Sequence, residues 1–357
     1  MSTPTLTSFA APRGGAPAPS ERPGGAGALA CVLTTIQAPT DQVRRLMERL
    51  APLGAPLVVA GDSAGPRSYL EDNCRFLSIE TQRASRWQLA RVLGERHYAR
   101  KNLAFLEAIA NGARCLYETD DDTFPNDAWA PREARVEAQA VTSGEWANVY
   151  RLFTDTLTWP RGLPLDAIHD TVGRGERRLV HAPIQQGLID GNTDVDAIWR
   201  LIWSQDIAFD AQAESVFLPK GAWCPFNSQS TWWWADAFPL LYLPFHCSFR
   251  MTDIWRGFVA QACLWAMDAH LVFHAPDSFQ VRNPHDLTVD FAKEVPGYLG
   301  NRKLAGVLAG LQLAPGRDTV AENLRTCYRA LVEAGLFPPE ELTLVDAFVA
   351  DLRSLGH

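Results

Sequence analysis

The acidic run Glu118-Thr-Asp-Asp-Asp122 closes an apolar segment, residues 114–119, and is the feature most able to do chemistry. Three adjacent carboxylates repel one another and destabilise a fold unless a cation neutralises them. Oxygen ligands favour a hard cation such as Mg²⁺ or Mn²⁺, which proteins often share with substrate phosphates. The run therefore indicates a metal and phosphate site, and the alternative is an exposed acidic turn, where Asp is also common.

Two cations, Arg100 and Lys101, open the helix predicted before this run. Positive side chains are unfavourable at the positive end of a helix dipole, and an anion bound there would account for them. A carboxylate–metal site beside an anion site is typical of a diphosphate-bearing substrate. The alternative is a solvated basic turn.

Alternating strands and helices are expected to position these residues. Apolar runs predict strands at 30–35, 57–60, 76–79 and 114–119. Two helices alternate with them, one after Thr40 with Val43, Leu46, Met47 and Leu50 on its apolar face, and one from about Arg100 to a stop at Gly112. This order predicts an α/β fold with a doubly wound, mostly parallel sheet, in which ligands bind at the carboxyl ends of strands.

Composition divides the chain into four parts. Residues 1–28, rich in Ala, Gly and Pro, predict a disordered tail, and 29–140 form the first α/β half. Residues 141–290 form an aromatic-rich half, since eleven of the twelve tryptophans lie between Trp129 and Trp265. Residues 291–357 predict a helical segment, with Val320, Leu324, Tyr328 and Leu331 on one apolar stripe.

Charge and cysteine usage exclude several classes of protein. A net charge of −8 argues against a general nucleic-acid binder. The sequence has no apolar run of about 20 residues, so we expect no membrane-spanning helix. Its N-terminus has no basic start followed by an apolar core, so we expect no secretory signal. The seven cysteines are scattered without a C-x-x-C pair, which favours reduced thiols. We expect a cytoplasmic protein.

Short motifs in a fixed order resemble the STELLO-type family of glycosyltransferases. They span about residues 30–290 and comprise Val59–Asp62, Phe76–Ile79, Ala99–Leu103, Tyr117–Asp122, Gln186–Leu188, Asp194–Ile198, Asn227–Gln229 and Thr252–Gly257. A more distant resemblance is to the reversibly glycosylated polypeptide and sugar-nucleotide mutase group.

The resemblance implies a GT-A-like fold, with a nucleotide-sugar-binding half at 29–140 and an acceptor half at 141–290. Asp120 and Asp122 would form a D-x-D motif that holds Mn²⁺ or Mg²⁺, with His285 as a third ligand and His274 as its rival. The donor pocket implied by the resemblance consists of Thr34, Thr35, Asp62, Arg100, Lys101, Asp120 and Asp121.

Asp253 is the candidate catalytic base for an acceptor hydroxyl, because inverting GT-A enzymes place an acidic residue at a helix start in the acceptor half. The alternative is a carboxylate stabilised by the helix dipole, with Thr252 as the cap. Candidate wall residues for the acceptor or sugar are Asn227, Gln229, Trp233, Arg250 and Arg256. Trp232–Trp234 suit stacking on a sugar or packing in the core, and Gln185 and Gln186 are expected in a loop at the pocket mouth.

These observations predict a metal-dependent glycosyltransferase that uses a nucleotide-diphosphate sugar, an unknown acceptor and an inverting mechanism. A sugar-nucleotide mutase on the same pocket is one alternative, because it needs the nucleotide site but no separate acceptor. A non-catalytic scaffold or binding protein is the other.

Overall fold

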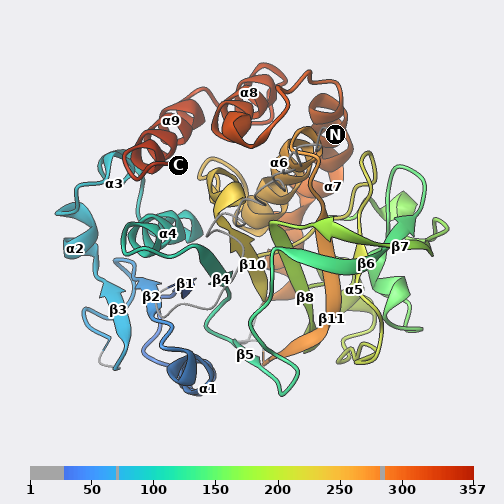
Figure 1. Cartoon of the computed structure of the whole chain (residues 1–357), viewed down its shortest axis with the longest axis horizontal. Helices are drawn as coiled ribbons and strands as arrows, with labels where there is room; N and C mark the ends of the chain where they lie inside the picture. The colour runs from blue at the N-terminus through green and yellow to red at the C-terminus, as the bar shows by residue number, and fades with distance from the viewer. Residues whose placement is uncertain (1–27, 70–71, 282–285) are drawn as a thin grey trace, which may run out of the picture.

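The computed structural model describes residues 28–69, 72–281 and 286–357 (Figure 1). Nearly all of the tail predicted at 1–28 lies outside the described residues. None of the helices formed by the described residues is long and apolar enough to cross a membrane.

One mixed sheet runs through both halves of the chain, in the order β3-β2-β1-β4-β10-β8-β11-β9-β6-β7, with β5 paired to β11. The first four strands in this order are parallel. Beyond β4 the sheet mixes parallel and antiparallel pairs. The strands are β1 (Leu29–Thr34), β2 (Leu57–Ala60), β3 (Cys74–Leu77), β4 (Cys115–Glu118), β5 (Thr123–Pro125), β6 (Arg135–Thr142), β7 (Gly173–His181), β8 (Ile184–Gly191), β9 (Val216–Phe217), β10 (Thr231–Trp234) and β11 (Leu271–Gln280).

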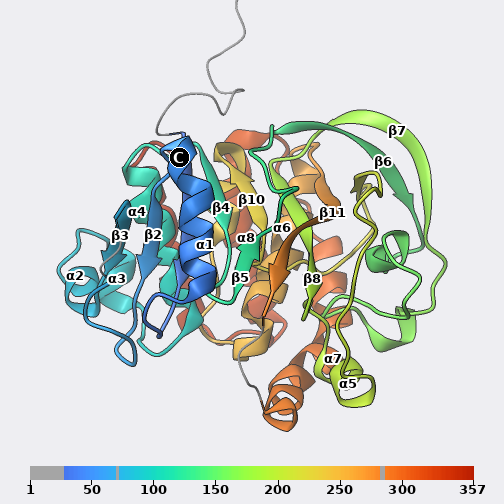
Figure 2. The ribbon, with the colours of Figure 1, turned by 90° about the horizontal axis from the view of Figure 1, so that it is seen from below.

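Helices cover both faces of the parallel part, with α1 on one face and α4 on the other (Figures 1 and 2). This confirms the predicted α/β, doubly wound fold. The α-helices are α1 (Asp41–Leu50), α2 (Ile79–Arg83), α3 (Gln88–Val92), α4 (Lys101–Ala110), α5 (Ala197–Ile202), α6 (Thr252–Ala266), α7 (Leu287–Ala309), α8 (Val320–Glu333) and α9 (Glu340–Arg353).

Strand β1 shows why the sheet is buried on both sides. Leu29, Cys31 and Leu33 pack in the core beneath α1, whereas Ala30 and Val32 face the larger core that includes α4. Successive side chains of a strand point to opposite faces, so an uninterrupted apolar run fits a strand covered on both.

One predicted element boundary is confirmed and another is corrected. The Thr40 side chain accepts the Val43 N–H at 3.2 Å and caps α1. The third predicted strand, 76–79, is corrected to Cys74–Leu77, because Ser78 accepts the Thr81 N–H and starts α2 at Ile79.

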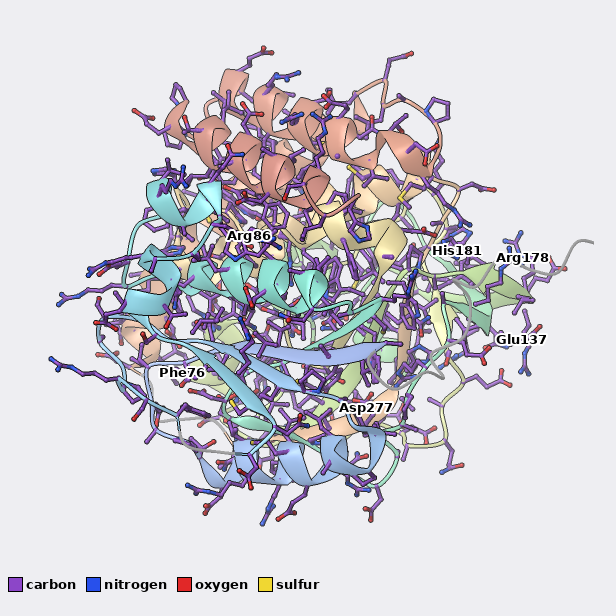
Figure 3. All side chains as sticks on the ribbon, turned by 60° about the vertical axis from the view of Figure 1, so that its left-hand side comes forward. Phe76, Arg86, Glu137, Arg178, His181 and Asp277 are labelled. Atoms are coloured by element: carbon purple, nitrogen blue, oxygen red, sulfur yellow. The ribbon has the colours of Figure 1, made fainter. Side chains whose placement is uncertain are left out.

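The sheet ends at β3 on one side and at β7 on the other. Figure 3 shows Glu137 and Arg178 projecting outward on the β6–β7 side, at the opposite end of the sheet from Phe76 on β3. At the β3 end, α9 packs on α3, and the Asp351 carboxylate accepts the N–H groups of Gln88 and Leu89, both at 2.9 Å. The C-terminal helices thus support the half that carries the acidic run.

Candidate active site

A cleft of about 720 Å³ lies where β1, β2 and β4 reach their carboxyl ends. Because β10 runs antiparallel to β4, with Thr231 opposite Glu118, the residues just before β10 reach the same edge. The ends of β8 and β11 also lie there. The lining residues include Thr34, Thr35, Ile36, Asp62, Arg96, His97, Tyr98, Asp120, Asp121, Asp122, Arg161, Asp194, Gln229, Phe249, Arg250, Asp253 and Gln280.

Asp121 and Asp122 turn to different partners. Asp121 accepts a short hydrogen bond from the Thr35 hydroxyl, and Asp122 accepts from Gln280 Nε2 at 3.0 Å. Burial raises the pKa of Asp122 to about 6, with further repulsion from Asp120, and burial also raises the pKa of Asp121. The negative charge of the run is therefore only partly compensated by protein groups.

Lys101 lies fully buried beneath the acidic run. Its ammonium donates to the Thr119 carbonyl and to Asp120 Oδ1, both at 2.9 Å, and to the Tyr98 hydroxyl. It is also 3.5 Å from Glu118 Oε1. Lys101 thus supplies positive charge through Asp120 rather than by lining the cleft.

Arg100 does not face the cleft, where it was expected to meet the phosphates of the donor. Its Nε donates to Gln82 Oε1 at 2.7 Å and its Nη1 donates to the Leu93 carbonyl at 3.0 Å. The side chain is 1% exposed and does not line the cleft. The expectation that Arg100 faces phosphates is corrected, because it holds a loop instead.

Trp233 and Arg256 are also corrected, because they form a buried cluster around Glu118 rather than a cleft wall. Arg256 Nη1 donates to both Glu118 oxygens, at 2.8 and 2.9 Å, and the Trp233 indole N–H donates to Oε2 at 2.9 Å. All three side chains are at most 1% exposed. Burial raises the pKa of Glu118, against the lowering effect of Arg256 and Lys101.

Asp253 lies at the start of α6 and lines the cleft. Arg161 binds it through two hydrogen bonds and binds Asp194 through two more, at 2.8 Å each. The Asp253 Oδ1 atom also accepts the N–H of Ile254 at 3.1 Å. Thr252 does not cap the helix as predicted, because its hydroxyl turns back to the preceding turn.

The remaining wall residues divide between the cleft and its support. Gln229 and Arg250 line the cleft, and Arg250 binds Glu294 at 2.8 Å. Asn227 lies behind them and donates to Asp194 Oδ2 at 2.9 Å, so its amide is already used. Gln185 and Gln186, expected in a loop, are buried in β8.

Asp62, at the end of β2, lines the cleft but has its carboxylate occupied by backbone donors. It accepts from the N–H groups of Ser63, Arg96 and His97, at 2.6, 2.8 and 2.9 Å. Thr34 is likewise engaged, because its hydroxyl donates to a β2 carbonyl at 2.8 Å. Neither side chain is a free ligand in this arrangement.

Tyr98 and Ser228 join the acidic run to Asp253. The Tyr98 hydroxyl donates to Asp120 Oδ1 at 2.6 Å and lies 2.7 Å from Ser228 Oγ, which is 3.4 Å from Asp253 Oδ2. Burial and nearby carboxylates raise the pKa of Tyr98 well above its usual value, so it keeps its proton. The sequence reasoning did not identify this connection between the two halves.

Further cleft residues were missed as well. Asp194 belongs to the motif at 194–198, which was part of the family resemblance and could have pointed to it. Five more cleft residues carry no local sequence motif: Arg96, His97, Arg161, Phe249 and Gln280.

Both carboxylates that were expected to hold a divalent cation lie in the cleft. Among residues 28–69, 72–281 and 286–357, no group of three or more His, Cys, Asp or Glu side chains is arranged to hold a metal ion. Asp120 and Asp122 nevertheless both line the cleft, where Lys101 pairs with Asp120 and Asp122 has a neutral donor, Gln280. Mg²⁺ is commonly bound by one or two carboxylates together with substrate phosphates, so two carboxylates suffice.

The histidines do not complete a metal site within the described chain. His285 lies outside the described residues. His274 is buried away from the cleft, with Nδ1 2.7 Å from the Ser215 hydroxyl and Nε2 2.9 Å from Gln185 Oε1. Its role is therefore in the core.

Comparison with known proteins gives matches to one family. A family model of the STELLO glycosyltransferases matches residues 250–357, from Arg250 to the C-terminus. "Probable glycosyltransferase STELLO1" of Arabidopsis thaliana is 25% identical over 352 residues, covering 91% of this chain and 44% of its own. "Probable glycosyltransferase STELLO2" of the same plant is 27% identical over 360 residues, covering 91% and 45%. The chain spans less than half the length of these relatives, and the matches confirm the resemblance seen in the motifs.

Proposed function

Because this chain is related to the STELLO glycosyltransferases, we propose that it moves a sugar from a nucleotide-diphosphate donor to an acceptor hydroxyl with the help of Mn²⁺ or Mg²⁺. The observation that supports this most is that one cleft is lined both by Asp120–Asp122 and by Asp253. The first group suits a divalent cation that would bind the leaving diphosphate, and the second suits the proton of an acceptor.

The donor half of the proposal rests on the strand ends. Asp120 and Asp122 would hold the metal ion, which would neutralise charge that develops on the leaving diphosphate. Lys101, which is itself fully buried, adds a fixed positive charge 2.9 Å from Asp120, and burial of a charge strengthens its interactions. Thr34 and Thr35, which line the cleft at the end of β1, are proposed to border the nucleoside.

The acceptor half rests on Asp253. As the acceptor oxygen bonds to the anomeric carbon, its proton passes to the Asp253 carboxylate. The bond from that carbon to the diphosphate oxygen breaks, and its electron pair leaves with the diphosphate. Attack from the side opposite the leaving group inverts the anomeric configuration, and Arg161 holds Asp253 in place through both oxygens.

Ligand binding is the first test. A thermal-shift panel of nucleoside diphosphates and their sugars, each with and without Mn²⁺, should give a metal-dependent rise in melting temperature for one nucleotide. Saturation at 100 times Kd stabilises the fold by about 2.7 kcal/mol. Nucleoside monophosphates serve as matched controls, because they lack the second phosphate. No shift with any of them favours a scaffold.

Turnover separates transfer from isomerisation. Donor incubated with the protein and followed by NMR should release nucleoside diphosphate, by transfer or by slow transfer to water. A mutase would instead change the ring form of a sugar still attached to the nucleotide. Accumulation of such an isomer contradicts the proposal.

A further inference from the structure

The loop of residues 93–97, which leads into α4, is fixed to the strand ends by Arg100. Nη1 of Arg100 donates to the Leu93 carbonyl at 3.0 Å, and its Nε donates to Gln82 Oε1 at 2.7 Å. Gln82 in turn donates to the Gly61 carbonyl at 2.7 Å, just after β2. A buried arginine with hydrogen bonds of this kind holds the loop rigidly at Leu93, where the loop begins.

Asp62 holds the other end of the same loop, at Arg96 and His97. Its Oδ1 accepts the Arg96 N–H at 2.8 Å and its Oδ2 accepts the His97 N–H at 2.9 Å. Charge-assisted hydrogen bonds to backbone N–H groups are among the stronger ones in proteins. Asp62 is therefore a positioning residue for the loop.

Arg96, whose N–H is held by Asp62, adopts an uncommon backbone conformation. Its φ is +56°, in the left-handed region that favours Gly and Asn over longer side chains. Such strain persists only where the surroundings impose it, and it gathers at functional sites. Here Asp62 accepts the N–H of Arg96 itself, and the Arg96 side chain lines the cleft.

Arg96 differs from Arg161 and Arg250 in that its guanidinium has no partner among the described residues. Arg161 is bound by Asp194 and Asp253, and Arg250 is bound by Glu294. Within residues 28–69, 72–281 and 286–357, no hydrogen bond or ion pair involves the Arg96 guanidinium. Its five N–H donors are available to an anion.

From these observations we infer that Arg96 binds the phosphates of the donor, the role that was expected of Arg100. The inference rests on the proposed function, since it names the protein contact for that donor's diphosphate. A planar guanidinium can bind phosphate oxygens in pairs. Tyr98, two residues further along, bonds to Asp120, so the same loop connects Arg96 to the acidic run.

The test is titration calorimetry of inorganic pyrophosphate with the full chain in the presence of Mg²⁺. Arg96→Asn removes the cation and suits the left-handed backbone, so the variant should fold as well as wild type. Loss of charge-assisted hydrogen bonds should weaken pyrophosphate binding about tenfold or more. The same loss should appear with the nucleoside diphosphate that the ligand panel selects.

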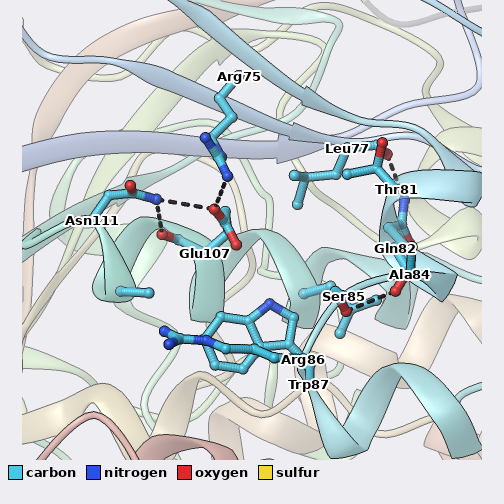
Figure 4. Close-up of a pocket in the computed structure, with 12 residues that line it drawn as sticks. Arg75, Leu77, Thr81, Gln82, Ala84, Ser85, Arg86, Trp87, Glu107 and Asn111 are labelled. Carbon is cyan, nitrogen blue, oxygen red and sulfur yellow. Dashed lines mark hydrogen bonds and ion pairs between the residues drawn. The ribbon is translucent and has the colours of Figure 1, made fainter.

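Arg86 offers a matched control. It is an exposed arginine in a separate pocket, where its guanidinium lies 4.5 Å from the Trp87 ring centroid. The Arg75–Glu107 ion pair lines another part of the same pocket (Figure 4). Arg86→Asn should leave pyrophosphate binding unchanged. An equal loss in both variants would mean that only the general charge of the protein matters, and would overturn the assignment.

The outcomes separate this inference from the proposed function. If Arg96→Asn binds pyrophosphate and the nucleotide as tightly as wild type, Arg96 is not the phosphate ligand, and the proposed function stands. If wild type binds neither ligand with any metal, both are overturned.

Asp62 supplies a second, independent measurement. If it acts by positioning Arg96, Asp62→Asn should weaken pyrophosphate binding, and the double variant with Arg96→Asn should lose little beyond Arg96→Asn alone. A merely structural role would give losses that multiply. Multiplying losses would overturn the positioning role of Asp62.

Discussion

The Arg161 guanidinium binds Asp253 through two hydrogen bonds, Nη1 to Oδ1 at 3.2 Å and Nη2 to Oδ2 at 2.9 Å. The same guanidinium binds both oxygens of Asp194. Two carboxylates thus share the Arg161 guanidinium, and Arg250 Nη2 lies 3.9 Å from Asp194 Oδ1 as well. The pairing fixes the direction of the carboxylate without neutralising the whole cluster.

Asp253→Asn should retain donor binding and lose donor turnover by about 100-fold or more, the usual contribution of a general base. Asn keeps the size of the side chain but accepts a proton poorly. The two readouts are the donor-induced thermal shift and the release of nucleoside diphosphate. Asp41→Asn, an exposed aspartate at the start of α1, is the control. Full turnover in the Asp253 variant excludes it as the base.

Asp122→Ala should abolish the Mn²⁺-dependent thermal shift while leaving the ligand-free protein at least as stable as wild type. Burial and repulsion raise the pKa of Asp122 to about 6, so its charge destabilises the fold at neutral pH. Melting with and without Mn²⁺ and nucleotide measures both effects. Asp127→Ala, on the surface beside Arg49, should change neither. A large loss of ligand-free stability would point to a structural role.

Glu118→Gln should destabilise the protein by about 3–5 kcal/mol, because it leaves the buried cations Arg256 and Lys101 without their shared carboxylate. The free energy of unfolding in urea measures the loss. Adding Arg256→Met should recover part of it, since the buried guanidinium that has lost its carboxylate is then removed.

The exposed pair Arg302–Asp166 provides the comparison for Glu118→Gln. Both side chains are largely open to solvent, so Asp166→Asn should cost less than about 1 kcal/mol. Similar losses for Asp166→Asn and Glu118→Gln would mean that burial of the Glu118 cluster does not determine its contribution.

His97→Asn should reduce the acid sensitivity of stability. Burial lowers the pKa of His97 from 6.5 to about 4, with Asp62 opposing the shift, and its Nδ1 accepts the Ala99 N–H at 3.1 Å. Between pH 6.5 and 4 only the unfolded chain gains this proton, so the free energy of unfolding falls as pH falls. The loss from His97 is at most about 3 kcal/mol.

Urea unfolding of wild type and His97→Asn at pH 7.5 and pH 5 checks this sign. Asn can still accept the Ala99 N–H, so the variant should fold and should lose less stability at the lower pH. Equal losses in the two proteins would show that another group titrates in this window.

The sequence by itself determined the parallel half of the fold and the position of its acidic run. Uninterrupted apolar strands such as β1, and amphipathic α1 with its Thr40 cap, are local patterns whose period reports directly on burial. Once the strands are parallel, their carboxyl ends share one edge, so the placement of Asp120–Asp122 beside Thr35 follows.

Only the tertiary structure decided which side chains face the cleft. Arg100 and Lys101 are neighbours in sequence, yet one is bound to Gln82 and the other to Asp120, because successive helical residues point in different directions. Core packing was one of the two sequence interpretations of Trp232–Trp234, but only the tertiary structure shows that the Trp233 indole N–H meets Glu118.

The contacts between distant residues of the site were likewise not predictable from sequence patterns. Arg161 and Asp253 lie 92 positions apart, and Arg96 and Asp62 come from separate loops. Periodicity reports whether a residue is buried and on which face of its own element. Which distant partner it meets there depends on how the strands of the sheet are ordered and how the loops between them are held.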